Sequence, residues 1–171
     1  PILTAQGFFG IEGVATWMGK PHEAQSAERQ SIYLSHERNI MQEIIRELGD
    51  DGWGLDHNIV IDTTGSVIYT GEEILAALKQ RSRVVYLGVP DSEIEYMYKQ
   101  YLADPKPVIW GDLFSVKEGE DIASALRRCY GLLLKERSKL YSRYADVTLI
   151  MNRIHRDKFT TGRLLALLGA K

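Results

Sequence analysis

The chain has little cysteine, little net charge and no long apolar run. Cys129 is the only cysteine among 171 residues, so no disulfide can form within the chain, which agrees with a reducing compartment. A net charge of −2 gives no general attraction to nucleic acid or to anionic membranes. No apolar run approaches the roughly 18 residues that a membrane-spanning helix needs. We therefore expect a cytoplasmic protein that binds neither nucleic acid nor membranes.

Helical and strand-like segments alternate along the chain. Apolar spacing and end signals predict helices over 11–18, 24–48, from 71, from 91, from 121 and over 160–168, and strands over 58–62, 83–89 and 146–150. The helix from 71 follows a capping box formed by Thr70 and Glu73. The stripe on the helix over 24–48 is mostly apolar and comprises Tyr33, Glu37, Ile40, Met41, Ile44, Ile45 and Leu48. The order strand, helix, strand predicts parallel pairing with a right-handed crossover.

The expected fold class is α/β, with one domain over residues 1–171. Helices should cover both faces of a parallel sheet, which gives three layers. Three strands make a narrow sheet of this kind, which buries little apolar area. The sheet is therefore predicted to be incomplete.

Residues 58–66 are the most informative segment. A β-branched apolar run leads into Asp62, and small residues follow it: Thr63, Thr64, Gly65 and Ser66. The carboxyl ends of parallel strands are where α/β folds bind ligands. Asp62 is therefore a candidate to hold Mg²⁺, directly or through water, or to act as a base near an accepting hydroxyl. The alternative is a turn aspartate that caps the residues after it.

In nucleotide-binding proteins such a strand is accompanied by a phosphate-binding loop, and this loop is missing from the sequence. No Gly-x-x-x-x-Gly-Lys-Ser/Thr loop, the Walker A loop that binds phosphates, occurs in this sequence. The sequence also begins at Pro1, with which translation does not start unless a methionine has been removed. We interpret the two observations together as a sign that a segment before Pro1 is missing on the N-terminal side.

Two further segments carry candidate binding residues. The proline-containing stretch 104–120 is a candidate lid, in which Lys106 would neutralise phosphate charge. The alternative is an ordinary loop whose aromatic residues pin it to the core.

Arg137 lies late in the helix that begins at 121, and its guanidinium suits a carboxylate or a phosphate. The alternative for Arg137 is a solvated surface arginine.

With these segments placed, the chain resembles the shikimate kinase family of small P-loop kinases over roughly residues 11–150. Residues 61–67 are similar to the Ala-Thr-Gly-Gly-Gly segment of the family, which contacts the accepting substrate. Residues 83–87 are similar to its next strand, and residues 136–141 and 145–148 to its late helix and final strand. The resemblance implies a three-layer parallel sheet of P-loop kinase type. This sheet is incomplete at the N-terminal side, because the Walker A strand of the family precedes the region of resemblance.

The resemblance also implies an activity. It is the ATP-dependent phosphorylation of the hydroxyl of a small acidic metabolite, with ATP and Mg²⁺ as cofactors, and we expect a monomer. The implied roles are catalysis and magnesium binding for Asp62, acceptor binding for Thr63, Thr64, Gly65, Ser66 and Arg137, and closure over phosphates for Lys106. The 171 residues alone are expected to be inactive, since they lack the Walker A loop.

The chain departs from the family at the substrate. The family's second substrate arginine falls at Leu34, and the Arg-Pro of its lid becomes Lys106-Pro107. These departures argue against shikimate as the acceptor, and Arg29 and Arg38 are candidates to replace the lost arginine. Two alternatives stay open: a non-catalytic descendant that binds a ligand or partner, and another P-loop phosphotransferase or phosphohydrolase.

Overall fold

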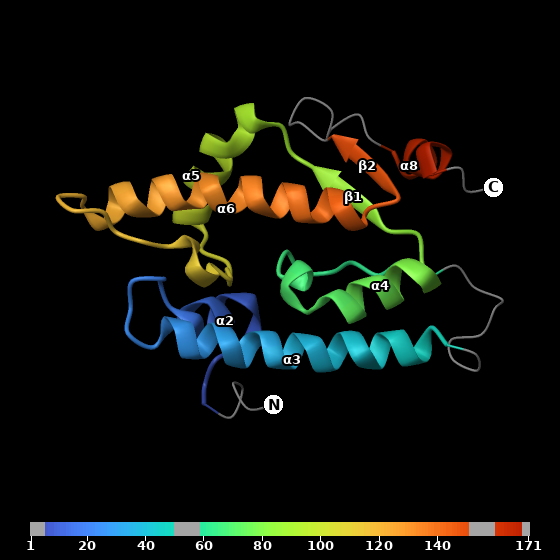
Figure 1. Cartoon of the computed structure of the whole chain (residues 1–171), viewed down its shortest axis with the longest axis horizontal. Helices are drawn as coiled ribbons and strands as arrows, with labels where there is room; N and C mark the ends of the chain where they lie inside the picture. Colours follow the sequence, from blue (N-terminus) through green and yellow to red (C-terminus); the bar gives the residue numbers. More distant parts are fainter. Residues whose placement is uncertain (1–5, 50–58, 151–159, 169–171) are drawn as a thin grey trace.

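The computed structural model describes residues 6–49, 59–150 and 160–168. Within these ranges the helices are α2 (Gly10–Met18), α3 (Ser26–Glu47), α4 (Glu72–Arg81), α5 (Ile94–Ala103), α6 (Ile122–Tyr144) and α8 (Thr161–Leu168) (Figure 1). The strands are β1 (Val85–Gly88) and β2 (Val147–Ile150), and short 3₁₀ turns lie at η1 (Val67–Tyr69), η2 (Asp91–Glu93) and η3 (Gly111–Leu113). The α/β class is confirmed, and the described part is mostly helical. The three-layer arrangement of P-loop kinase type stays a prediction.

The two strands pair in parallel. Val85 lies opposite Val147, and Gly88 lies opposite Ile150. The pairing extends one step beyond the strands, because the backbone N–H of Asp146 donates to the carbonyl of Val84 at 2.8 Å. Both strands were predicted, and α5 and α6 form the long connection that a parallel pair needs.

The predicted strand over 58–62 is wrong for the residues that the structure describes; Asn58 lies outside them. Residues 59–62 form no strand, and the Val60 side chain is 91% exposed. A strand forms only beside a hydrogen-bonded neighbour, and the described sheet contains β1 and β2 alone. The β-branched composition of this run is therefore not enough to make it a strand, and the predicted crossover from it to β1 is absent as well.

The predicted capping box is also wrong. The residue before the first turn of α4 is Gly71, with φ +122°, and it makes no side-chain cap. Thr70 is buried, and its hydroxyl donates to the carbonyl of Val67 at 2.7 Å. The turn η1, directly before Thr70, thus uses the hydroxyl that was expected to cap α4. By contrast, the helix predicted to begin at 121 is confirmed, and Asp121 caps it by accepting from the backbone N–H of Ser124 at 2.9 Å.

Helix α6 packs against two apolar clusters. The first lies with α3, α4 and η1 and contains Met41, Val67, Ile68, Ile74, Leu75 and Leu78, with Leu140, Tyr141 and Tyr144 of α6 packed on it. The second contains Tyr98, Trp110, Leu126, Cys129, Tyr130 and Leu133. Cys129 is fully buried, as its apolar helical setting suggests. Figure 1 shows α4 between the two longest helices, α3 and α6, with β1 and β2 beyond α6. No helix in the described ranges has the length and apolar character to cross a bilayer.

The candidate lid over 104–120 is fastened at several points. Trp110 is 2% exposed and belongs to the second cluster. The backbone N–H groups of Trp110 and Gly111 donate to Oε1 of Gln30 at 2.6 and 3.1 Å. These contacts are those of a loop pinned to the core by its aromatic residues, which was the alternative to a lid. A closing motion stays a prediction for the part before Ile109.

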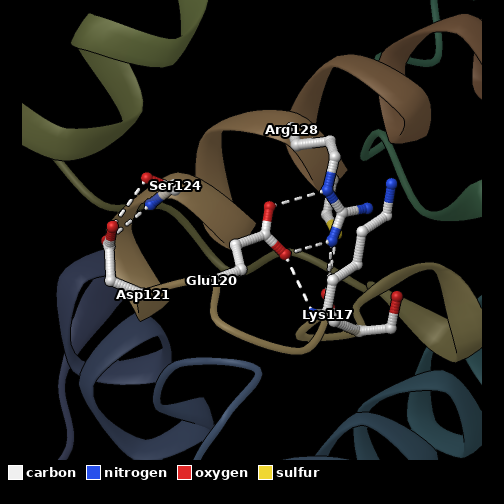
Figure 2. A network of polar contacts seen from close by, with 7 residues as sticks. Lys117, Glu120, Asp121, Ser124 and Arg128 are labelled. Atoms are coloured by element: carbon white, nitrogen blue, oxygen red, sulfur yellow. Dashed lines mark hydrogen bonds and ion pairs between the residues drawn. The ribbon is translucent and has the colours of Figure 1, made fainter.

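An ion pair holds the C-terminal end of this loop (Figure 2). Arg128 donates to both carboxylate oxygens of Glu120, at 2.8 and 2.7 Å, and to the carbonyl of Ser115 at 2.7 Å. The backbone N–H of Lys117 donates to Glu120 as well, at 3.0 Å. The hydrogen bonds from Arg128, and then that from Lys117, lower the pKa of Glu120 from its usual 4.5 to about 2. Charge-assisted bonds to the ionised form are the cause.

We predict that Arg128→Gln moves the acid titration of Glu120 upward. Because the folded pKa of about 2 lies below the usual 4.5, these contacts contribute fully above pH 4.5 and are lost as the pH falls toward 2. Removing Arg128 removes the largest cause, so the pKa should rise toward the usual value. The carboxyl carbon shift of Glu120, followed by NMR against pH, measures this. Arg127→Gln is the matched control, since Arg127 pairs with Glu95 at 2.7 Å instead. An unchanged titration in Arg128→Gln would contradict the assignment.

Candidate functional site

The turn over residues 64–66 lies between α3 and α6. Thr64 donates its hydroxyl hydrogen to Oε1 of Glu37, on α3. Thr64 Oγ1 lies 3.0 Å from Ser66 Oγ and accepts from the backbone N–H of Ser66 at 3.2 Å. The Ser66 side chain is buried, whereas Thr64 and Gly65 are exposed. Short polar side chains thus close this turn on itself and fix it to α3.

Arg137, from α6, reaches the same turn. Its Nη2 donates to the carbonyl of Ile109 at 3.0 Å, its Nε donates to the Tyr69 hydroxyl at 3.4 Å, and its guanidinium carbon lies 5.4 Å from the centre of the Tyr69 ring. A methyl group at position 65 would lie 3.2 Å from Nη1, which is why a glycine suits this position. Arg137 is half-buried, so it is not the solvated arginine of the alternative interpretation. The structure brings together Arg137 and the turn that the resemblance assigns to the acceptor.

Two tyrosines line the cluster. Tyr141 donates its hydroxyl hydrogen to the carbonyl of Gly65, and burial raises the pKa of Tyr141 to about 12. Burial, and next the charge of Glu37, raise the pKa of Tyr33, while hydrogen bonds with Ser66 and Thr64 oppose the rise. The turn is therefore surrounded by hydroxyl groups that stay protonated at neutral pH.

Glu37 is the residue that sequence reasoning missed. It was counted on the mostly apolar stripe of its helix, and it is 7% exposed. Its Oε1 accepts from Thr64, whereas its Oε2 is buried and has no hydrogen-bond partner among the described residues. The available signal was a charged residue at an apolar position, four residues after Tyr33 and four before Met41.

The other predicted site residues make no hydrogen bond or ion pair with this cluster in the described structure. Asp62 and Thr63 are exposed, and Asp62 makes no hydrogen bond or ion pair with a described residue. Lys106 pairs with Asp104 at 2.6 Å, and its side chain is 48% exposed. No group of three histidine, cysteine, aspartate or glutamate side chains that could hold a metal occurs in the described ranges. The structure thus joins Thr64, Gly65, Ser66 and Arg137 to one another, and shows no such contact for Thr63, Asp62 or Lys106.

The second substrate arginine of the family falls at Leu34, and the two candidates to replace it are Arg29 and Arg38. Leu34 is half-buried on α3. Arg38 donates to the carbonyls of Thr70 and Tyr69 at 3.0 and 3.5 Å, and Arg29 donates to that of Trp17. Both candidates are thus bound to backbone carbonyls in this arrangement, and neither makes a hydrogen bond or ion pair with the 64–66 turn.

Comparisons of the chain with family models, with curated proteins and with solved structures gave no match.

We predict that Tyr141→Phe lowers the free energy of unfolding by about 0.5–1.5 kcal/mol, because it removes the hydrogen bond to the Gly65 carbonyl. Urea unfolding measures this change. Tyr144→Phe is the control, since its hydroxyl makes no hydrogen bond with a described residue while its ring packs on the same cluster. With the folded pKa raised from 10.0 to about 12, the contribution of the neutral phenol should hold below pH 10 and disappear as the pH rises through 12. Equal losses in the two variants would count against this bond.

Proposed function

We propose that this chain provides the acceptor-binding side of a small-molecule kinase similar to the shikimate kinases. Such an enzyme transfers a phosphoryl group from ATP to the hydroxyl of a small acidic metabolite. One observation carries the proposal: Arg137 meets Gly65 of the 64–66 turn, although the two lie far apart in the sequence. The resemblance alone implied that these two segments form one site. The finer fold, a P-loop kinase sheet completed by further strands, is part of the same proposal.

The chemistry of the cluster suits an acid with a hydroxyl group. Nη1 of Arg137 makes no hydrogen bond with a described residue and points toward the exposed turn. Arg137 can donate two parallel hydrogen bonds to a carboxylate, one from Nη1 and one from Nη2, once Nη2 releases the carbonyl of Ile109. The hydroxyl hydrogen of Thr64 is donated to Glu37, so toward an acceptor hydroxyl the exposed Thr64 oxygen would serve as a hydrogen-bond acceptor. Asp62 is two residues before Thr64 in the sequence, and we propose it as the base for that hydroxyl.

The residues present fit the two cofactors unequally. Magnesium binds through one or two carboxylates together with substrate phosphates, so a single exposed carboxylate at Asp62 is compatible with it. ATP needs a loop of backbone N–H groups around its phosphates, and this sequence contains no such loop. We therefore derive no catalytic step through the nucleotide, and the kinase activity is proposed for a protein in which a Walker A loop accompanies this chain.

The gene sequence directly tests the proposed kinase activity. The codons before that of Pro1 should encode, in frame, a strand followed by Gly-x-x-x-x-Gly-Lys-Ser/Thr. A stop codon there, with no such loop, would leave an acid-binding module without catalysis. If the loop is present and the longer protein hydrolyses ATP without regard to any acceptor, the protein is a phosphohydrolase instead.

We predict that the chain binds at least one small acid of a panel, and that Arg137→Gln weakens this binding about 10- to 100-fold, the loss expected for hydrogen bonds to a charged group. The panel comprises 3-hydroxypropanoate, 4-hydroxybutyrate, serine, homoserine and shikimate, titrated by ligand-observed NMR. Gly65→Ala is a second variant, because its methyl group would crowd Nη1 at 3.2 Å and leave the charge in place. Arg143→Gln is the control on the same helix, since Arg143 is exposed and pairs with Glu72. If no acid binds the folded chain, the proposed function fails.

We predict weak or absent binding of ATP to the 171 residues alone, because they lack the phosphate-binding loop. Calorimetric titration with ATP and Mg²⁺ measures this. A dissociation constant below a millimolar would refute the expectation and would require a nucleotide site of another kind.

A further inference from the structure

Glu37 is a buried carboxyl group that forms no ion pair with a described residue. The side chain is buried, its Oε1 accepts from Thr64, and its Oε2 has no partner. Proteins seldom bury a carboxylate without a cation or a full set of hydrogen bonds, because desolvation of an unpaired charge is costly. An oxygen of this kind beside a predicted acceptor segment indicates a group that the ligand supplies.

The nearby cations Arg38 and Arg137 form no ion pair with Glu37. Arg38, the next residue, donates to the carbonyls of Tyr69 and Thr70. Arg137 donates to the carbonyl of Ile109 and to the Tyr69 hydroxyl. Leu34 lies one turn before Glu37 on the same face of α3. Its side chain is uncharged.

We propose that the acceptor is a zwitterion, a small hydroxy acid that also carries an ammonium group, and that Glu37 selects it by binding that ammonium. This inference rests on the proposed function, since it concerns the same site. Glu37 contacts Thr64 and Arg137 approaches Gly65, so the two charged side chains flank adjacent residues of one turn. A hydroxy amino acid could therefore place its carboxylate at Arg137 and its ammonium at Glu37 at the same time.

Other occupants fit Glu37 less well. A hydroxyl group would fill the hydrogen-bonding capacity of Oε2 but would leave the charge unbalanced. A divalent cation takes several oxygen ligands, and no group of three metal-binding side chains of the acidic, histidine or cysteine type occurs in the described ranges. An ammonium supplies both the charge and three donors.

The test compares acids that differ only by the ammonium group. Serine is paired with 3-hydroxypropanoate, and homoserine with 4-hydroxybutyrate, each titrated into the 171-residue chain by ligand-observed NMR at pH 7. In at least one pair the amino acid should bind about 10-fold or more tightly, the effect of a hydrogen-bonded charge pair. In Glu37→Gln that preference should fall to about 2-fold or less. Glu43→Gln, which changes an exposed carboxylate on the same helix, should keep the preference.

A second measurement needs no ligand. The substitution Glu37→Gln keeps an amide oxygen for Thr64 and removes the charge. It should therefore leave the urea midpoint of the free chain unchanged, or raise it, relative to Glu43→Gln. A lowered midpoint would mean that the buried carboxylate is not costly to the free chain, and it would overturn the inference.

The binding outcomes separate the two proposals. If the hydroxy acids bind and the amino acids bind no better, or if the preference survives in Glu37→Gln, the ammonium site is refuted while the acid site stands. If none of the four compounds nor shikimate binds the folded wild-type chain, the proposed function is refuted and this inference with it. A preference that is lost only in Glu37→Gln supports both.

Discussion

The packing of one long helix, α6, is the constraint on which the rest of the structure depends. Its N-terminal half buries Leu126, Cys129 and Leu133 in the aromatic cluster, and its C-terminal half lies against the cluster formed with α3 and α4. Burial of apolar area is the main favourable term in folding. A helix shared by two clusters therefore joins segments that have few other contacts with each other. The same helix leads directly into β2, so its placement also sets the parallel pairing with β1.

The candidate site results from the packing of α6. Arg137 lies on α6 between the residues that serve the two clusters, so its guanidinium emerges where they meet. From there it contacts Ile109 of the pinned loop and Tyr69 of the turn η1. Glu37 reaches the same place from α3. The side chains of Glu37 and Arg137 thus come from two long helices, with the exposed residues Thr64 and Gly65 between them. Sites held by helices keep their geometry better than sites built on loops alone.

The sequence predicted the parts of this structure that local pattern decides. The limits of α3 and α6 follow from apolar periodicity and, for α6, from the Asp121 cap, and the short apolar runs at 83–89 and 146–150 contain β1 and β2. It failed where the outcome depends on a distant partner. The run at 59–62 has no neighbouring strand, and the Thr70 hydroxyl bonds within η1 instead of capping α4. Periodicity placed Glu37 on a buried stripe correctly but could not reveal Thr64 as its partner, because the two are brought together only by the tertiary fold. The meeting of Arg137 with Gly65 was reached through resemblance, not through spacing.

The unpaired β-branched run has a consequence for how the chain behaves in concentrated solution. Val60 is almost fully exposed and Ile59 is 40% exposed, and among the described residues β1 and β2 each have one neighbour and one open edge. Open edges and exposed β-branched residues together are the usual starting point for strand pairing between molecules. Within the described part of the chain, this exposed run and the two open edges are the features most suited to strand pairing between molecules.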